Sequence, residues 1–167
     1  MSVWPVFFAN DTDAKFSDCN KYRYALWRKW NENLPPLVFL MLNPSKANEV
    51  DNDATITRCI GFAKREGSGG IIVANMFALC STNPAGLYTA ADPIGPENAV
   101  WLERVCQCAS KVVVAWGNEP IARGREADIL NLLNVQGIPA YCLGKNKQGS
   151  PKHPVRLHGD TPLIPYP

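Results

Sequence analysis

Short apolar runs punctuate the chain at four places, and each run is bounded by polar residues, glycine or proline. Runs of this length and composition are typical of strands that are buried on both faces, as in a parallel sheet. The pattern therefore predicts four central strands, at residues 37–42, 71–75, 112–117 and 138–143.

Segments with helical periodicity lie between the apolar runs. Residues 53–66 place apolar side chains at positions i, i+3, i+4 and i+7, and Gly67 favours an end to the helix there. A second helix is expected to begin at Pro96, and a third to follow Asn118, which would cap it. This alternation of strands and helices predicts an α/β protein, with three α/β/α layers around a four-stranded parallel sheet.

The segments outside this alternation have weaker patterns. Residues 21–30 mix aromatic and basic side chains, and they predict an edge strand or the arm of a hairpin. At this length we expect one domain over residues 1–167. Within it, residues 1–36 are expected to form an N-terminal arm with the edge strand, residues 37–157 the core, and residues 158–167 a C-terminal tail.

Composition and charge exclude several classes of protein. Apolar residues make up 46% and charged residues 19% of the chain, which is typical of a globular fold. The formal net charge of +2 is too small for a basic field over the whole molecule, so a nucleic-acid surface would have to be local. No apolar run approaches the roughly 20 residues of a membrane span, and the start has no signal-peptide pattern. We therefore expect a cytoplasmic protein with no membrane partner.

Cysteines and cofactor motifs give little sign of a bound group. The six cysteines include no CxxC pair, and several lie in apolar runs. We expect reduced thiols and no metal, with a zinc or iron–sulfur site as the less supported alternative. Neither G-x-G-x-x-G nor GxxxxGK[ST] occurs, so no dinucleotide or phosphate-loop cofactor is expected.

Polar residues follow the predicted strands at their carboxyl ends. LNPS ends the first strand, Asn75 the second and AWGN the third, and the fourth leads to a loop that contains His153. Parallel strands bring these ends to one edge of the sheet, where ligands bind. We therefore expect Asn43, Asn75 and His153 to face one pocket. Each also has a simpler explanation, as a turn residue in the case of the two asparagines and as a surface residue in the case of the histidine.

In order and spacing these motifs resemble those of the uracil-DNA glycosylase superfamily. That family has a GxDPY or G-[IM]-NPG motif after its first strand, an Asn after its second, an LWG-like third strand and a terminal HP motif. The matches here are LNPS, VANMFALCST, VVVAWG and PKHPVRL, and NMFALCST resembles the NLV-x-R-x-T stretch of the mismatch-specific branch. Residues 21–157 also resemble a bacterial and phage domain family without an assigned function, whose pattern is LNPS…D…T..R…N.FA…DP.G…WG…G.P.HP.

The resemblance implies a uracil-DNA glycosylase-like fold and a monofunctional DNA glycosylase that needs no cofactor. Such an enzyme flips a nucleotide out of DNA and hydrolyses the bond between base and sugar, which leaves an abasic site. In this alignment Asn43 takes the position that holds the attacking water, and His153 the position that donates to the pyrimidine carbonyl. Asp51 and Asp53 are nearby in sequence and either is a candidate to assist, although Asp53 also suits a helix N-cap.

The base-binding residues implied by the resemblance are Asn75, Pro44, Ser45 and Phe77. Asn75 takes the position that reads the base edge. Ser45 stands where strict uracil enzymes have a tyrosine against the C5 side of the base. This small side chain predicts a bulky pyrimidine, such as hydroxymethylated or glucosylated cytosine of phage DNA, with uracil as an alternative. In the family, a phenylalanine that follows the first motif stacks on the flipped base. The corresponding residues 43–55, NPSKANEVDNDAT, contain no aromatic residue, so Phe77 is the candidate to stack on the base.

DNA is the expected partner, and basic residues beside these motifs are its candidate contacts. Lys46 follows the first motif, and Lys147, Lys152 and Arg156 surround the histidine, so all four are expected to meet phosphates. We expect a monomer that serves in anti-phage defence. Two other functions stay open: a non-catalytic nucleic-acid or base-binding module on the same fold, and a hydrolase of free nucleosides or nucleotides.

Overall fold

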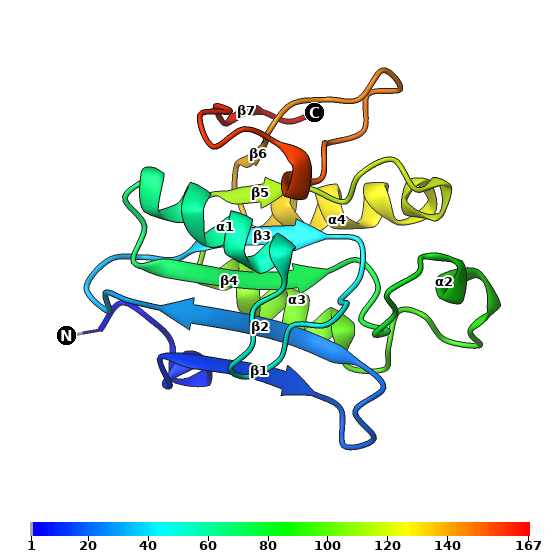
Figure 1. Cartoon of the computed structure of the whole chain (residues 1–167), viewed down its shortest axis with the longest axis horizontal. Coiled ribbons are helices and arrows are strands. Elements are labelled where there is room, and N and C mark those ends of the chain that lie inside the picture. Colours follow the sequence, from blue (N-terminus) through cyan, green and yellow to red (C-terminus); the bar gives the residue numbers. More distant parts are fainter. Residues whose placement is uncertain (1) are drawn as a thin grey trace.

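A mixed sheet of seven strands forms the centre of the computed structural model, which describes residues 2–167 (Figure 1). The strands in spatial order are β1 (Thr12–Phe16), β2 (Arg23–Lys29), β4 (Gly70–Asn75), β3 (Leu37–Met41), β5 (Val112–Val114), β6 (Ala140–Cys142) and β7 (Ile164–Pro165). β3 pairs in parallel with both β4 and β5, and β5 pairs in parallel with β6. The predicted parallel centre is therefore confirmed.

The sheet is larger than the predicted four strands, because three antiparallel strands extend it: β1 and β2 on one side and β7 on the other. β2 is the inner arm of a hairpin and pairs with β4, with Leu26 opposite Val73. Of the two alternatives predicted for residues 21–30, the hairpin arm is confirmed and the edge strand is wrong, since β1 occupies that edge. β1 has the sequence TDAKF, in which polar residues hide the strand pattern.

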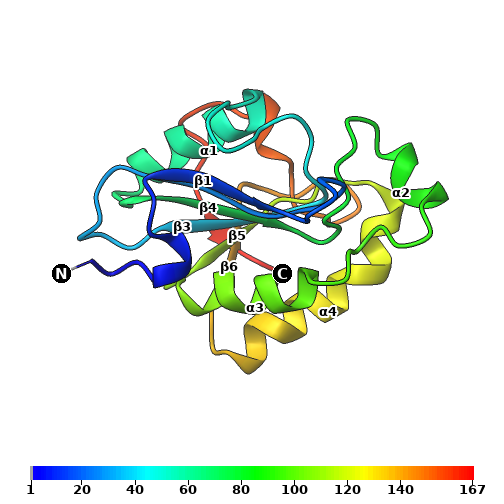
Figure 2. The same cartoon turned by 90° about the horizontal axis from the view of Figure 1, so that it is seen from below.

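Helices cover both faces of the sheet, so the three predicted layers are confirmed (Figure 2). α1 (Ala54–Arg65) lies on one face, and α3 (Asn98–Gln107) and α4 (Arg123–Val135) lie on the other. The short α2 (Ala85–Thr89) lies between the second predicted strand and the helix expected from Pro96, where no helix was predicted. Three 3-10 turns complete the elements: η1 (Val6–Phe8), η2 (Pro120–Ala122) and η3 (Pro154–Arg156). No helix within residues 2–167 is long and apolar enough to cross a membrane.

Two predicted helix caps have different outcomes. The Asp53 carboxylate accepts a hydrogen bond of 2.9 Å from the Ile56 amide, as an N-cap of α1 should. Asn118 does not cap a helix, because η2 precedes α4 and delays its start to Arg123. The Asn118 side chain instead bonds Gln148 and Ser150 of the following loop.

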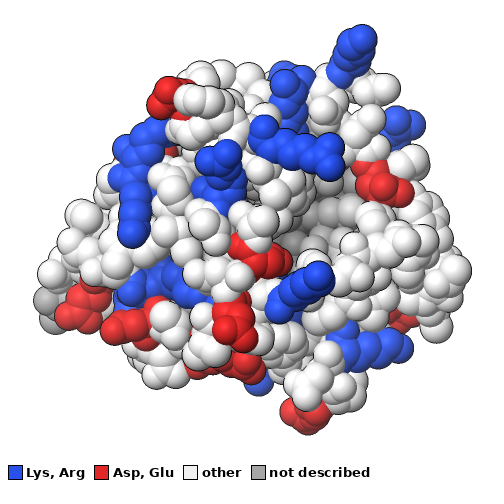
Figure 3. Space-filling view, in the orientation of Figure 1, with Lys and Arg blue, Asp and Glu red and all other residues white. Residues whose placement is uncertain are grey.

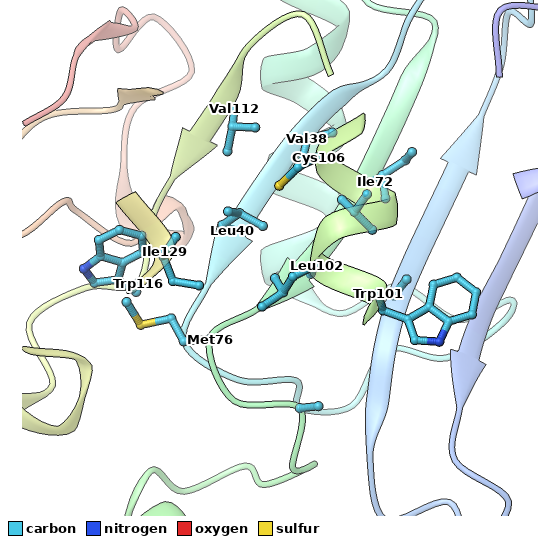
Figure 4. Packing of buried hydrophobic residues seen from close by; sticks show 14 of the residues in the cluster. Val38, Leu40, Ile72, Met76, Trp101, Leu102, Cys106, Val112, Trp116 and Ile129 are labelled. Carbon is cyan, nitrogen blue, oxygen red and sulfur yellow. The ribbon is translucent and has the colours of Figure 1, made fainter. Parts of the chain in front are cut away.

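Each face of the sheet has its own hydrophobic cluster. The larger cluster packs the sheet against α3 and α4, where Leu102 and Ile129 meet the strand residues Val38, Leu40 and Ile72 (Figure 4). The smaller cluster packs the sheet against α1 through side chains such as its Phe62. The chain leaves β3 towards β4 over one face and leaves β4 towards β5 over the other, so a crevice is expected at the carboxyl ends of these strands.

Candidate functional site

A pocket of about 270 Å³ lies at the carboxyl edge of the parallel strands. Its walls include Asn43 after β3, Asn75 at the end of β4 and His153 before η3. The structure therefore brings together the three residues that were predicted to share a pocket because they follow the carboxyl ends of parallel strands. Figure 3 shows the surface hollowed at this edge of the molecule, with basic and acidic side chains around the rim. The volume is near the lower end of the roughly 300–1,000 Å³ of typical ligand sites, which suits a small ligand.

Asn43 presents an oxygen acceptor of fixed orientation. Its Nδ2 donates to the carbonyl oxygens of Ser81 at 2.8 Å, of Pro44 at 3.1 Å and of Leu79 at 3.4 Å. Since carbonyls only accept hydrogen bonds, the amide cannot be turned over, and its Oδ1 is left for another donor. This oxygen can hold a water molecule by accepting a hydrogen bond from it.

Asn75 is the most unusual polar residue of the pocket. Its side chain is 1% exposed, yet neither Oδ1 nor Nδ2 has a hydrogen-bond partner within the described residues. Buried amides without partners are rare, because leaving such a group unpaired costs about 1–3 kcal/mol. One acceptor and two donors are thus available to whatever enters the pocket.

Asn98 and Arg125 hold the backbone next to Asn75, and sequence reasoning missed both. Asn98 Nδ2 donates to the Asn75 carbonyl at 3.0 Å and to the Met76 carbonyl at 3.2 Å, and Arg125 Nη2 donates to the Met76 carbonyl at 3.1 Å. These bonds fix the direction in which the end of β4 presents its side chain. The only sequence signal was a polar residue on the inner face of α3.

His153 is arranged to donate while neutral. Its Nδ1 accepts a hydrogen bond of 3.3 Å from the Val155 amide, so the neutral ring carries its proton on Nε2. Burial lowers the pKa of His153, and the Asp53 carboxylate raises it by a smaller amount. The ring is therefore uncharged at neutral pH and offers one N–H donor.

The lowered pKa of His153 predicts a pH dependence of stability. As the pH falls below the ordinary value of 6.5, the unfolded chain binds a proton before the folded one does, so the free energy of unfolding falls until the lowered pKa is passed. His153→Gln is expected to remove this loss, as measured by chemical denaturation between about pH 5 and 8. His158→Gln is the matched control, because His158 is exposed. Equal pH profiles for the wild type and His153→Gln would contradict the prediction.

The aromatic wall of the pocket is Trp116 and not Phe77. Phe77 is 3% exposed, belongs to the larger hydrophobic cluster and is absent from the pocket lining, so its predicted place beside a base is wrong. Strand pairing continues past β4, with the Phe77 amide donating to Leu42, and this turns the ring into the core. Trp116 follows β5, lines the pocket and packs edge-on against Tyr166 with ring centroids 5.9 Å apart.

Of the other candidate residues in and after the LNPS motif, some line the pocket and others lie on the surface. Pro44 and Ser45 line the pocket, and Ser45 is exposed at its mouth. Asp53 lines it as well, in addition to capping α1. Asp51 and Lys46 are exposed and are not part of the lining.

The basic loop, residues 145–156, lies directly beside the pocket. Lys152 and Arg156 line a second hollow of about 500 Å³, and His153 lines both hollows. Lys147 is exposed in the same loop. Within residues 2–167 no group of three or more His, Cys, Asp or Glu side chains is placed to hold a metal ion.

Fold and pocket together define a three-layer α/β protein with a small polar site at the carboxyl edge of its sheet. A family model described as "Protein of unknown function (DUF1643)" matches residues 23–155, and the chain belongs to that family. The matched range contains every residue of the pocket. No curated protein matches the chain, and no solved structure does.

Proposed function

We propose that this protein is a DNA glycosylase that hydrolyses the N-glycosidic bond of a pyrimidine flipped into the pocket. The observation that carries the proposal is the buried Asn75 amide, whose acceptor and two donors have no partner among residues 2–167. A pyrimidine edge presents a complementary set of donors and acceptors. The resemblance of the strand-end motifs to the uracil-DNA glycosylase superfamily supports the same reading, because an Asn in this position reads the base there.

Three other polar residues of the pocket have a role in this reaction: Asn43, His153 and Asp53. As the bond breaks, the sugar becomes oxocarbenium-like and the base gains negative charge. Asn43 Oδ1 orients the attacking water, and His153 Nε2–H donates to a carbonyl of the base as charge grows there. The negative charge of the Asp53 carboxylate stabilises the positive charge that develops on the sugar. An amide cannot remove a proton from water, so a slow enzyme is expected.

Ser45 supports a substrate with a substituent at C5. Its side chain is small and lies at the exposed mouth of the pocket, where a C5 group would point by the family resemblance. Hydroxymethylated or glucosylated cytosine of phage DNA fits this description, and anti-phage defence would be the biological setting. Uracil is the alternative substrate.

The enzyme assay tests the proposal directly. Duplexes that carry uracil, a thymine mismatch, 5-hydroxymethylcytosine or glucosylated 5-hydroxymethylcytosine are incubated with the protein and then heated in alkali, which cuts abasic sites. Strand scission on one of them is the expected result. No scission on any duplex, with base release from free nucleosides, would identify a nucleoside hydrolase. Tight binding without any release would identify a binding module.

The basic loop predicts salt-dependent DNA binding. Each phosphate contact contributes about 0.9 to the slope of log affinity against log salt concentration. The double variant Lys147→Gln/Lys152→Gln is therefore expected to lower the slope by roughly 1.8, as measured by fluorescence anisotropy with a duplex. Lys15→Gln is the control, because Lys15 is exposed on β1 at the far edge of the sheet. An unchanged slope for the double variant would place the DNA elsewhere.

A further inference from the structure

Arg23 enters the pocket because of an irregularity in β2. The pairing of β1 with β2 shifts here, since Lys15 pairs with Ala25 but Phe16 pairs with Arg23, which leaves Tyr24 as an extra residue. Tyr24 and Ala25 consequently both face the larger hydrophobic cluster. This bulge turns Arg23 towards the opposite face, where it lines the pocket.

The guanidinium of Arg23 is buried with one side left free. The residue is 3% exposed, and its Nη1 donates to the Ala47 carbonyl at 3.0 Å. Its Nε is buried with no partner, and its Nη2 makes no hydrogen bond within residues 2–167. No carboxylate of the described residues lies within 4.0 Å of it. Burial lowers the pKa of Arg23 to about 10, so the group stays charged at neutral pH.

Arg28 on the same strand shows what a structural arginine looks like in this fold. It donates from Nε to Asn52, from Nη1 to two backbone carbonyls and from Nη2 to the carbonyls of Asn48 and Asp51. Its Nε and Nη2 hold the loop after β3, and its Nη1 bonds the backbone of β1 and β2. All three nitrogens thus have protein partners, and Arg28 does not line the pocket. Arg23 makes one such bond, so loop support does not account for its burial.

We propose that Arg23 is a further catalytic residue, whose free Nε–Nη2 edge binds the leaving base and stabilises the negative charge that develops on it. The inference rests on the proposed glycosylase function. Among the described residues that line the pocket, Arg23 is the only lysine or arginine. Because His153 is neutral, only Arg23 among these residues supplies a positive side-chain charge to balance the negative charge of the leaving base. The two donors of this edge point in parallel, which suits a pair of neighbouring acceptor atoms such as a ring nitrogen and the adjacent carbonyl oxygen.

The charge arises in the bond-breaking step. The electron pair of the C1′–N1 bond leaves with the base, which becomes an anion delocalised over its ring nitrogens and carbonyl oxygen. The water oxygen bonds C1′ and releases a proton to solvent, and the base anion takes up a proton from solvent. A guanidinium that is already desolvated and fixed in place needs no reorganisation as this charge appears, and losing such a donor typically slows the reaction by about 10²–10³-fold.

Single-turnover base release by Arg23→Gln, Arg23→Lys and the wild type tests the proposal. The substrates are duplexes that carry the released base and an analogue with a more electron-withdrawing group at C5, which is the better leaving group. Arg23→Gln is expected to lower the rate by about 10²–10³-fold, to lose less with this analogue, and to recover in part with added guanidinium ion. Lys21→Gln, which neutralises an exposed lysine beside β2, is the charge control.

A second measurement needs no variant. The wild type is titrated calorimetrically with free 5-fluorouracil at pH values below and above the pKa of its ring nitrogen, and tighter binding of the anion is expected. Equal affinity for both forms, or no binding, overturns the proposal, as does a folded Arg23→Gln with the wild-type rate on both duplexes. Weaker DNA binding at an unchanged rate would assign Arg23 to a phosphate and also overturn it. Absence of base release by the wild type is a failure of the glycosylase proposal itself.

Discussion

Asn75→Leu is expected to lower base release by about a thousandfold and to raise the free energy of unfolding by about 1–2 kcal/mol. Leucine has nearly the shape of asparagine and no polar atoms, so the variant loses the donors and the acceptor that we propose read the base. It also removes a buried amide that no group within residues 2–167 satisfies. Single-turnover kinetics and chemical denaturation measure the two effects. Opposite signs for activity and stability are the signature of a residue kept for a ligand.

Asn98→Leu is the matched control for this experiment. Asn98 is equally buried, but its Nδ2 donates to the carbonyls of Asn75 and Met76. Its replacement is therefore expected to lower the free energy of unfolding by about 1–3 kcal/mol. If Asn75→Leu is destabilised to the same extent, the Asn75 amide has a structural partner, and base reading belongs to another residue.

Asn43→Ala is expected to lower the rate of base release by about 10²–10³-fold and to leave the affinity for DNA unchanged. The reason is that, in the proposed mechanism, Asn43 Oδ1 orients the attacking water and makes no contact with the base. Single-turnover rates and anisotropy titrations with the same duplex separate the two quantities. A parallel loss of affinity and rate would place Asn43 in base binding.

Asn43→Asp is the informative companion variant. A carboxylate at this position would face the carbonyls of Pro44, Leu79 and Ser81, to which the present amide donates. Oxygen acceptors on all sides raise the pKa of a carboxyl group, so this variant is expected to be less stable at neutral pH and no faster than the wild type. An increase in rate would show that the carbonyls move aside for a general base.

The parallel centre of the sheet and the meeting of Asn43, Asn75 and His153 were predictable from sequence for one physical reason. Strands buried on both faces must be apolar along their length, and parallel strands must end at a common edge. Polar residues that follow such runs therefore converge, however far apart they lie in the chain. The antiparallel flank formed by β1 and β2 was not predicted in full, because an exposed edge strand has no such constraint on its composition.

The residues that sequence reasoning missed or misplaced depend on tertiary detail. Arg23 reaches the pocket only through a bulge, and no local pattern marks the extra residue. Trp116 looks like the end of an apolar strand, but β5 stops at Val114. Trp116 is buried in the larger hydrophobic cluster and also lines the pocket. Phe77 lies close to a predicted site residue in sequence, yet continued strand pairing directs it into the core.

The hydrogen bond from the Val155 amide to His153 Nδ1 ties the imidazole to the backbone of the basic loop. Any displacement of that backbone on docking against a polyanion shifts the ring with it. If the loop binds DNA as proposed, DNA binding and the alignment of the His153 N–H donor are therefore coupled. A free nucleoside does not contact the loop, so it would meet the donor in the position set by the unbound backbone.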